Sequence, residues 1–307
     1  MARLILVHDR VVARALPRIA RAAALTHSGR SFLEHLLCTW RILVDWHLPT
    51  AVCRAGFLHS AYSTSHYGEA LFRFDEREDV RGMIGPEAEE LVYRFCAMDR
   101  RDYWDQLARM RDCGPLAYPD RRRAGARVRI SRTKLAQLLM IESANVAEQS
   151  RAATGGPAPW MSRVFGWWRF LDADTLPVRF GVLPALTKRA DERAIDAYEH
   201  ALAVPLRRAV PLLEEAIDQN PWAAEPRIMR ALCEPSHTPA RRTELAKSVH
   251  LLSGWAVAWD KRVSANGWRA LCRRMERASR DPSREPTFES VRAVLSRKAH
   301  KPRFLAV

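Results

Sequence analysis

The chain has 307 residues, a formal net charge of +15 and 48% hydrophobic residues. This length exceeds the roughly 100–200 residues of one domain, so we expect two domains with ordinary buried cores. No run approaches the ~20 apolar residues that a membrane-spanning helix needs, and the apolar stretch before His8 is too short for a signal peptide. The six cysteines form no CxxC pair, which is typical of a reduced protein. These features predict a cytoplasmic protein without a membrane partner.

The positive charge does not by itself indicate a nucleic-acid partner. Arginine accounts for 44 of the 50 basic residues, a bias that a GC-rich genome produces without any function. Acidic residues are interspersed with the arginines along most of the chain. Only the arginines of residues 121–129 form a cluster, and we interpret that cluster as a solvated loop. The charge pattern therefore disfavours nucleic-acid binding.

Apolar residues recur at helical spacing along the N-terminal half, and strands are hard to find there. Ser31 followed by Glu34 has the capping-box pattern that starts a helix. Pro86 stands where prolines often occupy the first turn of a helix. The pattern predicts helices over residues 3–25, 33–46, 50–58 and 86–95, with a polar loop over residues 63–78.

The rest of the chain continues the helical pattern after one interruption. Residues 127–130 alternate and predict a short strand, and Ser131 then begins a strong helix over residues 134–149. Glycine and proline between residues 154 and 159 predict a linker. Residues 197–222 resemble one tetratricopeptide-type hairpin, with no second copy evident at the ~34-residue period. We therefore predict an all-α fold, with a helical domain over residues 1–153 and a second helical, tetratricopeptide-like domain over residues 160–307.

Three histidines of the first domain fall where a metal site inside a helical bundle would need them. His27 precedes a predicted helix, His35 lies one turn into it, and His59 ends the next helix. Packed helices can bring such distant side chains to one interior ion, and Asp99 could add a carboxylate. Imidazole ligands suit Zn, Fe or Mn, so the expected cofactor is a divalent metal ion of this kind.

Four segments around these residues follow one another in a recognisable order: HSGRSFLEH (27–35), AGFLHS (55–60), IGPEAEELV (84–92) and MDR (98–100). This order resembles the hydrolase domain of RelA/SpoT alarmone enzymes, a branch of the HD metal-dependent hydrolase superfamily. It is more similar still to a bacterial and plant family of that superfamily, in which HSxxSLxxHLxGT is followed by AGLFHSxYGT. The resemblance covers residues 25–100, roughly a quarter of the chain, and implies an HD-like helical fold for the first domain.

The resemblance also implies a set of metal ligands. HD hydrolases hold one metal by a His, a His-Asp pair and a later Asp, and these positions correspond here to His35, His59, Ser60 and Asp99. Serine replaces the aspartate of the pair and is a poor ligand, so the site would be completed by His27 or by water. A site with three protein ligands and one open position suits hydrolysis, because a bound water can be acidified there.

Further positions are candidates for catalysis and for substrate binding. Alarmone hydrolases carry a Glu-Asp pair where this chain has Tyr62 and Ser63, which disfavours alarmone hydrolysis by that mechanism. Arg30 could hold a phosphate, as could Arg100. We list Arg30, Ser60 and Tyr62 as candidate catalytic residues, and Arg30, Thr64 and Arg100 as candidate substrate-binding residues.

Three functions remain open from the sequence. The first is a metal-dependent phosphohydrolase that acts on a small phosphorylated or nucleotide-like substrate. The second is an HD-type non-haem iron oxygenase, which the replaced aspartate disfavours because a two-iron centre needs a bridging carboxylate. The third is a catalytically inactive HD-fold protein that binds a ligand or partner. In each case the C-terminal helices could cover the site or mediate a homo-oligomer.

Overall fold

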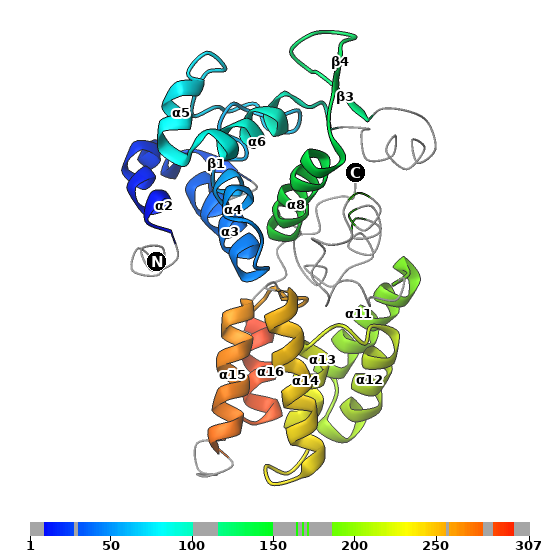
Figure 1. The fold of residues 1–307 in the computed structure, drawn as a ribbon. Helices are drawn as coiled ribbons and strands as arrows, with labels where there is room; N and C mark the ends of the chain where they lie inside the picture. The colour runs from blue at the N-terminus through cyan, green and yellow to red at the C-terminus, as the bar shows by residue number, and fades with distance from the viewer. Residues whose placement is uncertain are drawn as a thin grey trace. The chain divides into compact units, whose positions relative to one another are not determined.

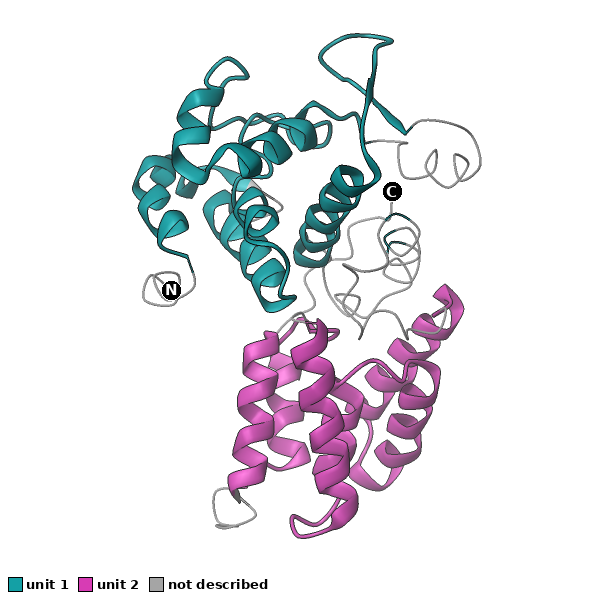
Figure 2. Cartoon of the chain, viewed as in Figure 1, with its two compact units in different colours: residues 1–149, 164–177 teal, residues 150–163, 178–307 magenta. Residues whose placement is uncertain are grey.

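A computed structural model describes residues 9–27, 30–100, 116–149, 164, 168, 171, 186–255, 258–278 and 285–297. The chain divides into two compact units (Figure 2): residues 1–149 with 164–177, and residues 150–163 with 178–307. The structure is mostly helical, with two short strand pairs (Figure 1), so the predicted all-α fold is confirmed. The predicted linker at residues 154–159 lies outside the described residues.

The first unit begins with two short helical elements instead of one long helix. Helix α2 (Arg10–Ala15) starts at Asp9, whose side chain accepts the N–H groups of Val11 and Val12. It is followed by a 3₁₀ helix, η1 (Leu16–Ala23), which has a proline in its first turn and non-helical angles at Ile19. The prediction of a continuous helix over residues 3–25 was therefore wrong, because Pro17 removes a backbone donor and disrupts the α-helical pattern.

Four helices form the core of the first unit, and each one contacts at least two of the others. They are α3 (Phe32–Asp45), α4 (Thr50–Phe57), α6 (Pro86–Ala97) and α8 (Arg132–Gln149). All four were predicted, because their apolar residues recur at helical spacing and are buried here. The Ser31 side chain, however, makes no capping hydrogen bond at the start of α3, so that part of the capping-box prediction was wrong.

Gly56 allows α3 and α4 to approach closely. A Cβ atom at this position would lie 2.1 Å from Cδ1 of Leu43 and 3.9 Å from Cγ2 of Thr39, both on α3. Only glycine therefore fits without a change of the buried Leu43 side chain or movement of α3. The close approach matters for the site, because His35 lies one turn before Thr39 and His59 follows α4 directly.

Helix α5 (Arg77–Ile84) was not predicted. Its sequence is rich in charge, and only Val80, Met83 and Ile84 are buried. This apolar face is too short for a clear helical pattern. Gly85, with φ +93°, separates α5 from α6 and lets the chain reverse direction between them.

Two antiparallel strand pairs complete the first unit. Strand β1 (Thr26–His27) pairs with β2 (Arg30–Ser31), immediately before α3. Strand β3 (Ala117–Pro119) pairs with β4 (Arg127–Arg129), which confirms the strand predicted at residues 127–130. The second hairpin is joined to the end of α6, because the Asp99 N–H donates to the Pro119 carbonyl (2.9 Å) and the Arg121 N–H donates to the Ala97 carbonyl (2.9 Å).

The second unit consists of helices around their own apolar core. They are α11 (Lys188–Ala203), α12 (Leu206–Gln219), α13 (Glu225–Leu232), α14 (Pro239–Trp255), α15 (Ala265–Ala278) and α16 (Phe288–Arg297). Helices α11 and α12 pack against each other across a two-residue connection, as the predicted hairpin requires. Buried polar groups join the core helices: Asp191 accepts from Asn220 (2.8 Å) and from the Trp259 indole (3.1 Å).

Tryptophans and cysteines serve packing in both units. Five tryptophans are fully buried: Trp40, Trp46, Trp168, Trp259 and Trp268. The cysteines in the described ranges are free thiols, and burial raises the pKa of Cys53 and of Cys96 to about 12. Within the same ranges, no helix combines the length and apolar character needed to cross a membrane.

Candidate functional site

Two histidines from different helices meet in the core of the first unit. His35 lies in the first turn of α3, and His59 follows the last residues of α4. Each is 1% exposed, and their Nε2 atoms are 3.1 Å apart. The rings lie nearly perpendicular, with centroids 5.0 Å apart. The sequence predicted both histidines as metal ligands, and the structure brings them together.

The other ring nitrogen of each histidine, Nδ1, is hydrogen-bonded to an acceptor. Nδ1 of His35 is hydrogen-bonded to Oε2 of Glu148, and Nδ1 of His59 is 2.8 Å from the Gly56 carbonyl oxygen. A carboxylate and a carbonyl can only accept, so each Nδ1 must carry a proton and donate it. In neutral rings, both Nε2 atoms then present lone pairs, and these lone pairs face each other.

A third acceptor lies beside the two Nε2 atoms. Oδ1 of Asn145, on α8, is 3.1 Å from Nε2 of His59. The orientation of this amide is set by its neighbours: its Nδ2 donates to Glu142 (3.3 Å), and its Oδ1 accepts from Nε2 of Gln149 (2.5 Å). The amide oxygen therefore faces the histidine, and a third lone pair joins the two from the rings.

Converging lone pairs repel one another unless something positive lies between them. A proton shared by His35 and His59 would make one ring an imidazolium, and a metal cation would bind all three atoms with both rings neutral. A tetrahedral ion bound at about 2.0–2.1 Å by two nitrogens separates them by roughly 3.3 Å. The observed separation of 3.1 Å is close to this value, so His35, His59 and Asn145 fit a small divalent ion.

The surroundings of the two rings also fit a metal site. A ligating histidine usually donates its second ring N–H to a carboxylate or a backbone carbonyl, which fixes the ring and makes it more basic. Here Glu148 accepts from Nδ1 of His35, and the Gly56 carbonyl accepts from Nδ1 of His59. Across the described ranges, no three His, Cys, Asp or Glu side chains come together as metal ligands. Among the described residues, the Asn145 amide oxygen is a third donor atom beside the two rings.

Asp99 is the other predicted ligand whose side chain the structure describes. Asp99 was predicted to supply the carboxylate, but it does not form a ligand cluster with the histidines. Its backbone N–H donates to Pro119, at the join between α6 and the β3–β4 hairpin. The backbone of His27 and of Arg30 lies in β1 and β2. Their side chains lie outside the described residues, so their predicted roles stay predictions.

The predicted catalytic and substrate residues after His59 are buried in the loop that follows it. Ser60 is buried, and its carbonyl accepts the Ser63 N–H (3.2 Å). Thr64 is buried as well, and its hydroxyl accepts the N–H groups of His66 and Tyr67. The Thr64 hydroxyl therefore fixes the turn of the loop.

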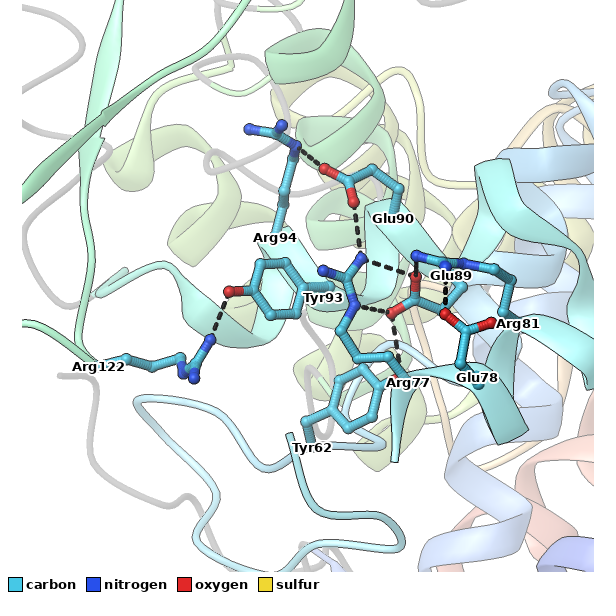
Figure 3. Close-up of polar contacts among 9 residues, drawn as sticks. All are labelled: Tyr62, Arg77, Glu78, Arg81, Glu89, Glu90, Tyr93, Arg94 and Arg122. Carbon is cyan, nitrogen blue, oxygen red and sulfur yellow. Dashed lines mark hydrogen bonds and ion pairs between the residues drawn. The ribbon is translucent and has the colours of Figure 1, made fainter. Parts of the chain in front are cut away.

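Tyr62 belongs to a charged network between the loop, α5 and α6 (Figure 3). Its hydroxyl donates to Oε1 of Glu89 (3.1 Å), a fully buried carboxylate that also accepts two hydrogen bonds from Arg77 (2.7 and 2.8 Å). Burial and the Glu89 charge raise the pKa of the Tyr62 phenol well above its usual value. The guanidinium of Arg77 stacks on Tyr93 at 3.8 Å. These contacts connect the loop to α5 and α6 through the Tyr62 hydroxyl, and the catalytic role predicted for Tyr62 stays a prediction.

Arg100 is buried between Glu142 and Phe95. It is 3% exposed, its Nη1 is hydrogen-bonded to Glu142, and its guanidinium lies 3.9 Å from the centre of the Phe95 ring. Phe95 in turn meets the His59 ring edge-on at 5.4 Å. Arg100 is thus linked to the histidine pair through Phe95, and also through Glu142 and Asn145.

Sequence reasoning missed the contribution of α8. Glu142, Asn145 and Glu148 are spaced by three residues, which places them on one side of a helix, and all three are buried. Polar residues that recur on an otherwise apolar buried face were the signal that could have identified them.

Comparison with known proteins gives one match. Residues 18–100 match the sequence model of a family described as "Domain of unknown function (DUF6817)". The matched segment contains His35 and His59 but ends before α8. No curated protein and no solved structure matches the chain.

Proposed function

We propose that the first unit is a metal-dependent hydrolase domain of the HD type, acting on a small phosphorylated or nucleotide-like substrate. One observation carries the proposal: Nε2 of His59 lies 3.1 Å from Nε2 of His35 and 3.1 Å from Oδ1 of Asn145, while each Nδ1 is held by an acceptor. The family resemblance at residues 25–100 supports the same pair of histidines.

Each residue of the proposed site has a separate role. His35, His59 and Asn145 would hold the ion, and Glu148 would orient the His35 ring and increase its basicity. A bound divalent ion would supply a Lewis acid that makes a water nucleophilic at neutral pH. Glu142 keeps the Asn145 oxygen directed at His59, because it accepts from the nitrogen of the same amide.

The donor set favours hydrolysis over oxygen chemistry at two irons. A two-iron centre needs carboxylates that bridge the ions. The carboxylates described next to the histidines are instead engaged as acceptors, Glu148 from His35 and Glu142 from Arg100 and Asn145. The site is therefore suited to one ion.

The first experiment is a metal analysis of the full chain purified without chelator. We expect close to stoichiometric metal in the wild type, and little metal in folded His35→Ala and His59→Ala variants. His250→Ala, an exposed histidine of the second unit, is the matched control and should keep the metal. Absence of metal from the wild type, even after Mn, Fe or Zn is added, would reject the metal site and leave a binding protein on this fold.

The identity and activity of the ion then separate the two enzyme hypotheses. Zn or Mn together with turnover of a generic phosphoester supports the hydrolase. Iron with an absorption band that changes on exposure to air would instead support the oxygenase. Turnover that is the same in His59→Ala as in the wild type would exclude the proposed site as its source.

A further inference from the structure

Two arginines approach the proposed metal site from separate parts of the first unit. Arg100 follows α6, and Arg121 lies in the β3–β4 hairpin, which hydrogen bonds fasten to residues 97–99. Arg121 Nε donates to the Cys96 carbonyl (2.5 Å), at the end of α6. The hairpin therefore places the Arg121 guanidinium at the end of α6, in the segment that leads to Arg100.

Arg100 has an unused donor although it is almost completely buried. Its Nη1 bonds Glu142, but its Nε has no hydrogen-bond partner within the described part of the chain. The Nε atoms of Arg81 and Arg227 also have no partner there, but those side chains are 36% and 13% exposed, against 3% for Arg100. Arg262 in the second unit, 9% exposed at its side chain, has every guanidinium nitrogen bonded to Asp260 or Glu199. A buried N–H of a charged group without an acceptor is costly, so the position of Arg100 suits an acceptor that arrives with a ligand.

The described hydrogen bonds of the Arg121 side chain go to neutral acceptors. Besides the Cys96 carbonyl, it donates to the Tyr62 carbonyl (3.2 Å) and to the Ser63 hydroxyl (2.7 Å). Burial lowers the pKa of Arg121, and the like charge of Arg100 lowers it further, whereas the charge of Asp99 acts in the opposite direction. Backbone carbonyls thus hold the Arg121 guanidinium, and the Glu142 carboxylate and the Phe95 ring hold that of Arg100.

We propose that Arg100 and Arg121 form an anion subsite that binds the phosphate group of the substrate beside His59. This inference rests on the proposed function and specifies its substrate class, a small phosphate ester. Guanidinium groups match phosphate oxygens by paired N–H donors, and two of them would neutralise a phosphate dianion that a single arginine balances only in part. Phosphate bound there would accept from Nε of Arg100 and separate the two like charges.

Phosphate titration of the full chain tests the subsite. Inorganic phosphate is titrated by calorimetry into the metal-free protein and into the metal-supplemented protein, for the wild type and for Arg100→Gln, Arg121→Gln and Arg122→Gln. Arg122 is the matched control, because it is the exposed neighbour of Arg121 and bonds the Tyr93 hydroxyl instead (Figure 3). We expect saturable binding in the wild type, weakened at least roughly tenfold in the Arg100 and Arg121 variants and unchanged in the control.

The outcomes separate the subsite from the metal site. Phosphate binding that is lost in Arg121→Gln while no variant or wild type holds metal would support the subsite and reject the proposed function. Metal in the wild type without phosphate binding, or with equal binding in Arg121→Gln, would overturn the subsite alone. Equal weakening in Arg122→Gln would also overturn it, because overall charge would then explain the effect. If Arg100→Gln does not fold, Arg121→Gln decides.

Discussion

Oε2 of Glu148 accepts a hydrogen bond from Nδ1 of His35, although the two residues lie 113 positions apart in the chain. Both side chains are buried, so the contact is formed only when α3 and α8 pack against each other. It fixes which nitrogen of His35 carries the proton, and it directs Nε2 towards His59. The chemistry of the site therefore depends on the tertiary structure of the first unit.

Replacing Glu148 by Gln should weaken metal binding without unfolding the protein. Glutamine can still accept from Nδ1, but it carries no charge, so His35 becomes a weaker base and a weaker ligand. Loss of the carboxylate that accepts from the non-ligating nitrogen of a metal-bound histidine typically lowers metal affinity 10–100-fold, and we expect a reduction of about that size. Competition with a chromophoric chelator measures it, and circular dichroism checks the fold. Unchanged affinity in a folded variant would contradict the role given to Glu148.

Replacing Gly56 by Ala should destabilise the first unit and disturb the site. The new Cβ would overlap Cδ1 of Leu43, so this fully buried side chain must change rotamer or α3 and α4 must move apart. Such overpacking costs about 1–3 kcal/mol in the free energy of unfolding, measured by urea denaturation. Gly82→Ala is the matched control, because Gly82 lies within α5 with open space around it. This variant should be more stable than the wild type by roughly 0.5–1 kcal/mol in the free energy of unfolding. Equal effects of the two substitutions would contradict the close approach of α3 and α4.

The charged network in Figure 3 predicts a ranking of three substitutions. Glu89→Ala removes a fully buried carboxylate that Tyr62 and Arg77 share, and should cost about 3 kcal/mol in the free energy of unfolding. Tyr62→Phe removes one hydrogen bond to Glu89, which Arg77 still neutralises, and should cost about 1 kcal/mol. Glu78→Ala, an exposed partner of Arg81, should change stability by less than about 0.5 kcal/mol. Denaturant unfolding measures all three.

Two outcomes would contradict this structural reading of the network. Loss of activity in Tyr62→Phe at unchanged stability would restore the catalytic role that the sequence predicted for Tyr62. A Glu89→Ala variant as stable as the wild type would show that Arg77 does not depend on this carboxylate.

Sequence patterns predicted the helices whose buried faces are long, and failed where the pattern is short. Helices α3, α4, α6 and α8 carry enough apolar residues at helical spacing to be recognised. Helix α5 buries only three residues, and Pro17 divides the first predicted helix. In these two places local chemistry and tertiary packing outweigh the periodicity.

The candidate site was predicted in part, for a comparable reason. His35 and His59 belong to segments that are close in sequence and carry recognisable motifs. Asn145 reaches His59 from 86 positions away, so its part in the site depends on how α8 packs against α3 and α4. Arg121 reaches the loop after His59 because the β3–β4 hairpin pairs with residues 97–99. The polar spacing on α8 indicates that Asn145 is buried, but the partner of each residue depends on tertiary packing.

The second unit should become less stable as the pH rises. Glu225 is fully buried, and burial, with the nearby charge of Asp260, raises its pKa from 4.5 to about 8. Between pH 4.5 and about pH 8, Glu225 is therefore protonated in the folded state but ionised in the unfolded state. The stabilisation from this bound proton is complete below pH 4.5 and is lost as the pH rises through about 8. Burial also raises the pKa of Asp191, to about 6, which adds a smaller loss between its unfolded pKa of 3.8 and pH 6.

Glu225→Gln isolates this effect. Glutamine keeps an oxygen that can accept the Trp259 N–H, a contact of 2.9 Å in the wild type, but it cannot ionise. We expect the melting temperature of the wild type to fall relative to the variant between pH 5 and pH 8.5, with the two most similar at the acidic end. Glu215→Gln, on an exposed position of α12, is the control and should follow the wild type. Parallel curves for the wild type and Glu225→Gln over the whole range would show that Glu225 does not hold its proton in the folded unit.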